Sequence, residues 1–283
     1  MHPSQDNTGT ERAATSGEPM KHHQVAVIRR LPHPGRGFTQ GLSTDGTNVW
    51  ESTGLYGHST LRRYRLGATE PDWIGPLDPT YFGEGICRIG THLWQLTWRE
   101  HRALRWSVSN HTLVDTVPLD RDGWGICHTG THVITSDGTS ELILRDPHTL
   151  RPLRTLPVTY AGDPLPCLND LEWAGGRIWA NLYGTAYLVG INPHDGTTTD
   201  LVDARTLHTH EPANPETWMN GIAAHPTGGF LLTGKHWTRI YHIRLTPDHN
   251  RIHPRHYTDM STLCLGSQLE THASTTSTEI GTL

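Results

Sequence analysis

One short pattern occurs five times along the chain, and this repetition constrains the fold more than any other feature. Each copy opens with a Gly-Ile, Gly-Leu or Asp-Leu pair, and the pairs begin at Gly41, Gly85, Gly125, Asp170 and Gly221. Successive copies begin 44, 40, 45 and 51 residues apart. A glycine-rich turn and an apolar strand, such as Leu93-Trp94, follow each pair. A repeat of this length, built from several short strands, is typical of a β-propeller.

The repeat therefore predicts an all-β fold, a five-bladed β-propeller with one blade for each copy. The sequence has no long stripe of apolar residues at helical spacing, which argues against a helical repeat. Residues 23–29 alternate between polar and apolar side chains and precede the first copy. We expect them to form the outer strand of the fifth blade, so that an N-terminal strand closes the ring and removes its open edges.

The length of 283 residues and the extent of the repeats favour a single catalytic domain over residues 22–257. Residues 1–21 are polar and lack the apolar segment of a signal peptide. Residues 258–283 are rich in Ser and Thr, and we expect both ends to be disordered tails. No stretch has the roughly 18 apolar residues of a membrane helix, so we expect no membrane partner. The lack of a visible signal peptide predicts a cytoplasmic location, and we also expect a monomer.

Charge and metal-binding residue types exclude some classes of function. The net charge of −5 and the absence of a basic block argue against a nucleic-acid partner. The 21 histidines are scattered, and the four cysteines show no zinc-binding spacing. We therefore expect no metal site and no cofactor. Cys87 and Cys127 occupy equivalent positions in two copies, which makes a bond between them improbable on geometric grounds, and we expect the cysteines to be free thiols.

The repeat also predicts which side chains meet at the axis of the propeller. The residue before each pair should lie at one end of the innermost strand, and these residues are Gln40, Glu84, Trp124, Asn169 and Asn220. The second strand of each blade runs antiparallel to the first and ends at the same edge. The residues expected there are Gly54, Trp98, Gly138, Tyr183 and Lys235. One mouth of the channel thus collects a carboxylate, an ammonium, three amides and three aromatic rings.

Polar residues near a propeller axis often bind only water, and this simple explanation has to be weighed. Two features argue against it. Glu84 is predicted to lie among aromatic and amide side chains rather than in an acidic run. Lys235 is one of two lysines in the chain, the other being Lys21 in the N-terminal segment. A lysine ammonium is a compact donor that arginine does not replace. The presence of Lys235 at the predicted channel therefore indicates that the chemistry there requires an ammonium group.

These residue types suit a proton transfer between nitrogen atoms. A carboxylate such as Glu84 can carry the proton, and donors such as Asn169 and Lys235 can stabilise a developing oxyanion. Aromatic walls from Trp98, Trp124 and Tyr183 can exclude water and orient a flexible peptide end. The set of residues alone is compatible with several reactions.

A resemblance to a known family narrows the choice among these reactions. The segments that carry it include Phe38-Thr39-Gln40-Gly41-Leu42, Phe82-Gly83-Glu84-Gly85, Gly123-Trp124-Gly125, Leu168-Asn169-Asp170-Leu171-Glu172, Asn220-Gly221-Ile222-Ala223 and Thr233-Gly234-Lys235-His236-Trp237. In this order, over residues 24–245, the chain resembles the plant/bacterial-type glutaminyl cyclases (glutaminyl-peptide cyclotransferases). That resemblance implies a metal-independent five-bladed propeller that converts N-terminal glutaminyl residues of peptides or proteins to pyroglutamyl residues and releases ammonia.

The resemblance also implies roles for the predicted residues. The glutamate matching Glu84 is the general base and acid, and the residues matching Asn169 and Lys235 hold the amide oxygen. Gln40, Trp98 and Trp124 position the substrate, together with Tyr183 and Asn220 from the two predicted rings. The chain departs from the family where Tyr183 stands in place of the usual tryptophan and Asp170 in place of a glutamate.

Two other functions remain compatible with the sequence. A non-catalytic propeller could bind peptide N-termini through the same channel, although it would have no need of both Glu84 and Lys235. A calcium-dependent propeller hydrolase would need several carboxylates around the axis, and Glu84 is the one carboxylate among the five inner positions.

Overall fold

The computed structural model describes residues 20–212 and 216–248, and these residues form sheets with very little helix. Three sheets have four strands each. The first contains β2 (Thr39–Thr44), β3 (Asn48–Thr53), β4 (Thr60–Arg65) and β5 (Trp73–Pro76). The second contains β6 (Gly83–Ile89), β7 (His92–Thr97), β8 (Arg102–Ser107) and β9 (Leu113–Pro118). The third contains β10 (Ile126–His128), β11 (Val133–Thr135), β12 (Glu141–Arg145) and β13 (Pro152–Pro157).

A fourth sheet has eight strands. Their spatial order is β16 (Leu168–Ala174), β17 (Arg177–Leu182), β18 (Tyr187–Ile191), β19 (Thr198–Asp203), β1 (Lys21–Pro32), β22 (Arg239–Pro247), β21 (Phe230–Gly234) and β20 (Met219–Ala224). A small hairpin pairs β14 (Thr159–Tyr160) with β15 (Asp163–Pro164). The helices of the described residues are η1 (Pro34–Arg36) and α1 (Arg205–His208).

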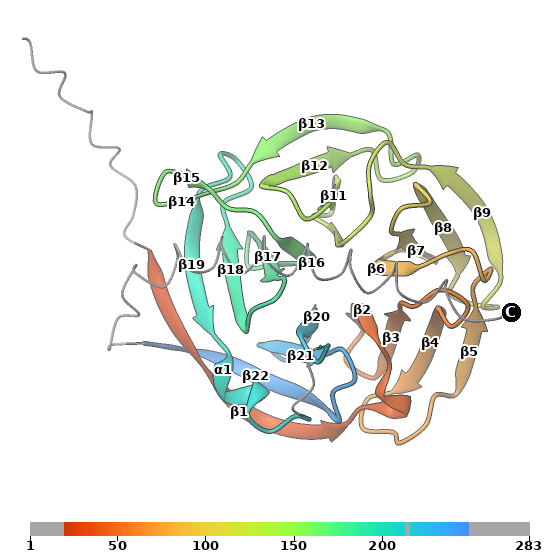
Figure 1. Cartoon of the computed structure of the whole chain (residues 1–283), viewed down its shortest axis with the longest axis horizontal. Coiled ribbons are helices and arrows are strands. Elements are labelled where there is room, and N and C mark those ends of the chain that lie inside the picture. Colours follow the sequence, from red (N-terminus) through yellow and green to blue (C-terminus); the bar gives the residue numbers. More distant parts are fainter. Residues whose placement is uncertain (1–19, 213–215, 249–283) are drawn as a thin grey trace, which may run out of the picture.

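The sheets are arranged around a central axis, as Figure 1 shows. Strands β2, β6, β16 and β20 lie near this axis, whereas β5, β9, β13 and β19 lie at the perimeter. The all-β, propeller-like fold predicted from the repeat is thus confirmed. The predicted tails, residues 1–21 and 258–283, lie outside the described residues except for Met20 and Lys21.

The N-terminal strand closes the ring, and it does so through two partners. Strand β1 pairs antiparallel with β22, with Val25 opposite Leu245, as expected from its position before the first copy. It also pairs parallel with β19, with Lys21 opposite Asp200. The sequence did not predict this second pairing, which joins eight strands into one sheet and leaves β1 without an open edge in this region.

The glycines of the repeat are explained by close packing of the innermost strands. A Cβ atom on Gly41 would lie 2.6 Å from the backbone nitrogen of Ile86, and one on Gly125 would lie 2.0 Å from the carbonyl oxygen of Asn169. The apolar residue of each pair is buried; these residues are Leu42, Ile86, Ile126, Leu171 and Ile222. The inner strands therefore pack backbone to backbone, and a side chain at the glycine positions would separate them.

The cysteine prediction is correct for two residues and wrong for a third. Cys87 and Cys127 are free and buried. Cys167 is disulfide-bonded. Cysteine spacing does not reveal which thiols a fold brings together, so the expectation of free thiols throughout was wrong.

Among the described residues, no helix combines the length and apolar character needed to span a bilayer.

A buried ion pair fastens the first sheet to the last. His33 Nε2 lies 2.8 Å from Glu51 Oε1, and both side chains are fully buried. His33 Nδ1 donates to the carbonyl oxygen of Trp237, 2.8 Å away, so the imidazole reaches from β3 to the segment after β21. Burial alone would lower the pKa of His33, but the Glu51 carboxylate and the two hydrogen bonds outweigh it and raise that pKa. The pKa of Glu51 is lowered despite its burial, because of His33, Arg62 and the Thr39 hydroxyl.

Glu51→Gln should therefore destabilise the protein by about 3–5 kcal/mol, because it leaves the buried imidazole without its counter-charge. The free energy of unfolding in urea at neutral pH is the measurement. The control is Asp115→Asn, which removes the exposed pair between Asp115 and Arg105 and should cost about 0–1 kcal/mol. Equal costs for the two variants would contradict the structural importance of the buried pair.

Candidate active site

Three predicted side chains from three inner strands form one hydrogen-bonded chain. Gln40 Nε2 donates to Glu84 Oε1 at 2.7 Å. Asn220 Nδ2 donates to Gln40 Oε1 at 2.9 Å and to the carbonyl oxygen of Thr39 at 3.2 Å. All three side chains are buried. The neutral amide of Gln40 on β2 thus holds the Glu84 carboxylate on β6 in place. The amide of Asn220 on β20 in turn orients Gln40.

Lys235 directly follows β21 and is also buried. Its backbone nitrogen donates to the carbonyl oxygen of Trp218 at 2.9 Å. Its Nζ atom lies 4.5 Å from the ring centroid of Phe38 and 4.9 Å from that of Tyr183. These distances suit cation–π attraction, so two aromatic faces hold the ammonium in place.

Glu84 and Lys235 influence each other's protonation. Burial raises the pKa of the Glu84 carboxyl well above its ordinary value, although the charge of Lys235 and the hydrogen bond from Gln40 oppose the rise. Burial lowers the pKa of Lys235 to about 8, although the charges of Glu84 and Glu216 oppose the fall. The pKa values of both groups are thus shifted in the direction of neutral pH. A side chain transfers protons most effectively when its pKa lies near the working pH.

Asn169 lies at the start of β16 and is buried. Its Oδ1 atom has no hydrogen-bond partner among the described residues, and the same holds for Asn220 Oδ1. The backbone oxygen of Asn169 accepts a bond of 2.7 Å from the hydroxyl of Ser136, the residue after β11, which ties this strand to the third sheet. A buried polar atom without a partner needs an explanation, and a bound substrate would provide one.

The predicted aromatic residues contribute to the site in different ways. Trp124 and Tyr183 meet edge to face, with ring centroids 5.5 Å apart. Trp98 packs against Phe82, 5.4 Å away, and the guanidinium of Arg99 lies 3.8 Å above the Trp98 ring. Tyr183 therefore adjoins Lys235 directly. Trp124 joins the site through Tyr183 and Trp98 through Phe82.

Two glycines at the predicted mouth make room for these rings. A Cβ atom on Gly54 would lie 2.3 Å from the Phe82 ring, and one on Gly138 would lie 2.7 Å from the Trp124 ring. A glycine thus follows the second strand of the first sheet and that of the third, because an aromatic side chain from a neighbouring segment fills the space where a Cβ atom would lie.

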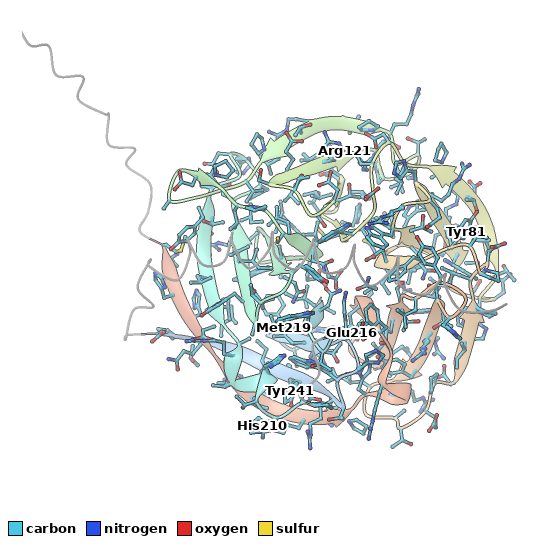
Figure 2. The ribbon with its side chains drawn as sticks, in the orientation of Figure 1. Tyr81, Arg121, His210, Glu216, Met219 and Tyr241 are labelled. Atoms are coloured by element: carbon cyan, nitrogen blue, oxygen red, sulfur yellow. The ribbon has the colours of Figure 1, made fainter. Side chains whose placement is uncertain are left out.

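Sequence reasoning assigned no role to three residues of the site. Phe38 and Phe82 each lie two residues before an inner-ring residue, Gln40 and Glu84 respectively. Because alternate residues of a strand share a face, this spacing could have identified them. Glu216 is exposed, acts on the charge of Lys235, and is labelled near the axis of the ring in Figure 2. It belongs to a loop, so no spacing signal was available for it.

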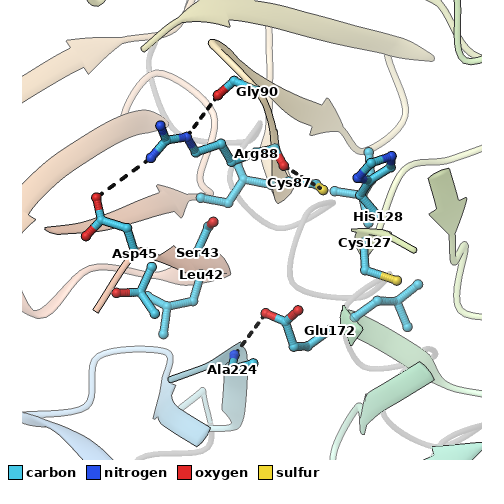
Figure 3. A pocket seen from close by; sticks show the side chains of 14 residues that line it. Leu42, Ser43, Asp45, Cys87, Arg88, Gly90, Cys127, His128, Glu172 and Ala224 are labelled. Atoms are coloured by element: carbon cyan, nitrogen blue, oxygen red, sulfur yellow. Dashed lines mark hydrogen bonds and ion pairs between the residues drawn. The ribbon is translucent and has the colours of Figure 1, made fainter. Parts of the chain in front are cut away.

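A cavity of about 430 Å³ lies elsewhere on the inner strands, and Figure 3 shows it from close by. Its lining includes Leu42, Cys87, Cys127 and Glu172, and none of the residues predicted for the site. Glu172 accepts bonds from two backbone nitrogens, and burial raises its pKa to about 7. Buried apolar residues of the repeat line this cavity together with residues that follow them along the chain.

Comparison with known proteins identifies the family. The model of a family described as glutamine cyclotransferase matches residues 4–245 of the chain. The chain belongs to the glutamine cyclotransferase family. It is 32% identical over 232 residues to a glutaminyl-peptide cyclotransferase of Arabidopsis thaliana, an alignment that covers 79% of this chain and 72% of the relative. The crystal structure of the glutaminyl cyclase of Myxococcus xanthus is similar with a TM-score of 0.76 and 33% identity, over 81% of this chain and all of the other.

The family resemblance inferred from the motifs is thus confirmed. The match to the Myxococcus xanthus structure also supports the propeller-like arrangement of the sheets, because more than four fifths of the chain is included in it.

The coupling of Glu84 and Lys235 can be tested by direct titration of Lys235. The chain has two lysines, so isotope-labelled lysine gives a simple spectrum in which Lys235→Arg assigns the signal. Lys235 should titrate with a pKa of about 8. In Glu84→Gln this pKa should fall further, because the carboxylate that favours the charged ammonium is gone. An unchanged or higher pKa in the variant would contradict the coupling.

Proposed function

We propose that this protein converts N-terminal glutaminyl residues of peptides or proteins to pyroglutamyl residues and releases ammonia. Membership of the glutamine cyclotransferase family supports the reaction. The observation that carries the proposal for this chain is a buried carboxyl near a buried ammonium. Glu84 accepts a 2.7 Å bond from Gln40, and Lys235 lies against the rings of Phe38 and Tyr183.

The proposal includes where the reaction takes place. The eight-stranded sheet divides into two blades, β16–β19 and β1 with β20–β22, so that the propeller has five blades. The reaction then occurs at the mouth of the central channel where the inner strands begin. The glutamine side chain enters between Trp124, Tyr183 and Phe82, and the peptide extends outward into solvent.

In the proposed reaction, the α-amine attacks the side-chain amide carbon and a new carbon–nitrogen bond closes a five-membered ring. The ionised Glu84 carboxylate accepts the proton that the attacking amine loses. It then gives this proton to the departing amide nitrogen, whose bond to carbon breaks, and ammonia leaves. A carboxyl group with a raised pKa suits both steps, because it accepts and releases a proton near neutral pH.

The developing charge on the amide oxygen needs fixed donors. Lys235 supplies the ammonium, which Phe38 and Tyr183 hold at 4.5 and 4.9 Å from their ring centroids. Asn169 supplies its side-chain amide, and its buried Oδ1 can accept a hydrogen bond from the substrate. This mechanism uses side chains alone and needs no metal or cofactor.

The remaining residues position the reacting groups. Gln40 orients the Glu84 carboxylate, and Asn220 orients Gln40. Trp124 and Tyr183 form one wall, and Trp98 supports Phe82 on the other side. Such positioning lowers the barrier by holding the amine close to the carbon it attacks. The cytoplasmic location and the monomeric state remain predictions of the sequence.

Glu84→Gln should lower turnover by about 10²–10⁴-fold, because the variant cannot carry the proton between the two nitrogens. The measurement is ammonia release from Gln-Ala, with the pyroglutamyl product confirmed by mass spectrometry. Glu172→Gln is the matched control, since Glu172 is a partly buried carboxyl whose pKa is also raised by burial but which lines the separate cavity. It should retain turnover close to that of the unaltered protein.

Two results would contradict the proposal. Near-normal turnover of Glu84→Gln would remove Glu84 from the proton transfer. If the folded, unaltered protein released no ammonia from any glutaminyl peptide but still bound such peptides, the protein would be a non-catalytic binder of peptide N-termini.

A further inference from the structure

Two exposed apolar side chains stand beside the mouth of the candidate active site. Leu55 and Tyr56 follow β3 and are 37% and 44% exposed. The other exposed large apolar residues of the described chain lie on β1 or on the outermost strands β5, β9 and β13, and they are Ile28, Ile74, Leu113, Val114 and Leu153. The pair at Leu55 and Tyr56 is therefore the exposed apolar surface that borders the site.

Tyr56 belongs to a continuous row of rings that begins at Lys235. Its ring meets that of Phe82 edge to face, with centroids 5.3 Å apart. Phe82 in turn lies 6.2 Å from Phe38, whose ring holds the Lys235 ammonium. Only the Tyr56 end of this row is exposed to a large extent, so the row leads from the buried ammonium to solvent.

Hydrogen bonds hold Tyr56 in its place. Its hydroxyl donates to Glu100 Oε1 at 2.7 Å, and Glu100 Oε2 accepts a bond of 3.2 Å from the backbone nitrogen of Phe82. One carboxylate thus joins Tyr56 to Phe82, the residue directly before the strand that carries Glu84. The ring is pre-organised, so a ligand that packs on it loses little entropy in ordering it.

The backbone of the loop is fixed as well. Leu55 has a φ of 86°, in the left-handed region that a branched side chain seldom adopts. The Ser59 hydroxyl donates to the Leu55 carbonyl at 2.9 Å and accepts from the Gly83 nitrogen at 3.0 Å. Backbone strain of this kind persists where the surroundings enforce it and is often found at ligand contacts.

We propose that Leu55 and Tyr56 contact the residue that follows the N-terminal glutamine, and that the enzyme favours peptides with a large apolar or aromatic second residue. This inference rests on the proposed function. With the glutamine side chain in the channel, the second residue is the first that lies outside it. On the side of Lys235 and Tyr183 the mouth carries the exposed Glu216, so the apolar contact is available on the Tyr56 side.

The physical basis is the burial of apolar surface. A phenylalanine or leucine side chain in the second position would remove its own surface and that of Tyr56 and Leu55 from water. A phenylalanine ring could also meet the Tyr56 ring in an edge-to-face arrangement. A glycine in the same position would gain neither contribution, so the difference between the two peptides isolates this contact.

The test compares kcat/KM for Gln-Phe-amide and Gln-Gly-amide. The unaltered enzyme should prefer Gln-Phe-amide by about tenfold or more. Tyr56→Ala should lose most of this preference while its kcat/KM for Gln-Gly-amide changes by about twofold at most. Tyr56→Phe, which keeps the ring and loses the bond to Glu100, should retain the preference. Leu153→Ala, an exposed apolar residue on β13, is the control and should change neither value.

A binding measurement separates failure of the inference from failure of the proposed function. Dissociation constants for the two peptides are measured on Glu84→Gln with and without Tyr56→Ala. Tighter binding of Gln-Phe-amide that disappears with the Tyr56 ring supports the contact even if no turnover is found. Equal affinity for both peptides, or an equal loss for both on Tyr56→Ala, would overturn the inference and leave the cyclisation reaction untouched.

Discussion

The close approach of the innermost strands is the constraint on which the rest of the structure depends. Around the axis there is no room for a Cβ atom at Gly41, Gly85 or Gly125, and the Gly85 nitrogen donates directly to the carbonyl oxygen of Trp124 at 2.7 Å. The five inner strands therefore begin at one narrow place. The residues that precede the repeated pairs must therefore lie close together at this place. This brings the side chains of the site together although they are far apart in the sequence.

Two fully buried carboxylates in this protein have opposite protonation behaviour. Glu51 is bonded to His33 and Thr39, and its pKa is lowered although burial acts to raise it. Glu84 has the neutral Gln40 amide as its side-chain donor and Lys235 as a nearby charge, and its pKa is raised. The number and charge of the donors decide between the two outcomes. Glu51 is thereby suited to hold two sheets together, and Glu84 to accept and release a proton.

Much of the candidate site could be predicted from the spacing of the repeat. Gln40, Glu84 and Asn220 were expected at one end of the inner strands, and they form a single hydrogen-bonded chain there. The antiparallel return of the second strand brought Lys235 and Tyr183 to the same end. Other contacts could not be predicted this way. Tyr56, Glu100 and Glu216 belong to loops or turns, whose positions depend on the packing of the sheets and not on a period.

The sequence by itself determined the all-β repeat, the family, and which residues begin each inner strand. These properties follow from local patterns, namely the alternation of side chains along a strand and the return of an antiparallel hairpin. The tertiary structure alone decided that β1 joins β19 as well as β22, that rings fill the space beside Gly54 and Gly138, and how Glu84 and Lys235 titrate. The titration of Glu84 and Lys235 depends on their burial and on distances between sheets that are far apart in the chain. Neither quantity can be read from a local sequence pattern.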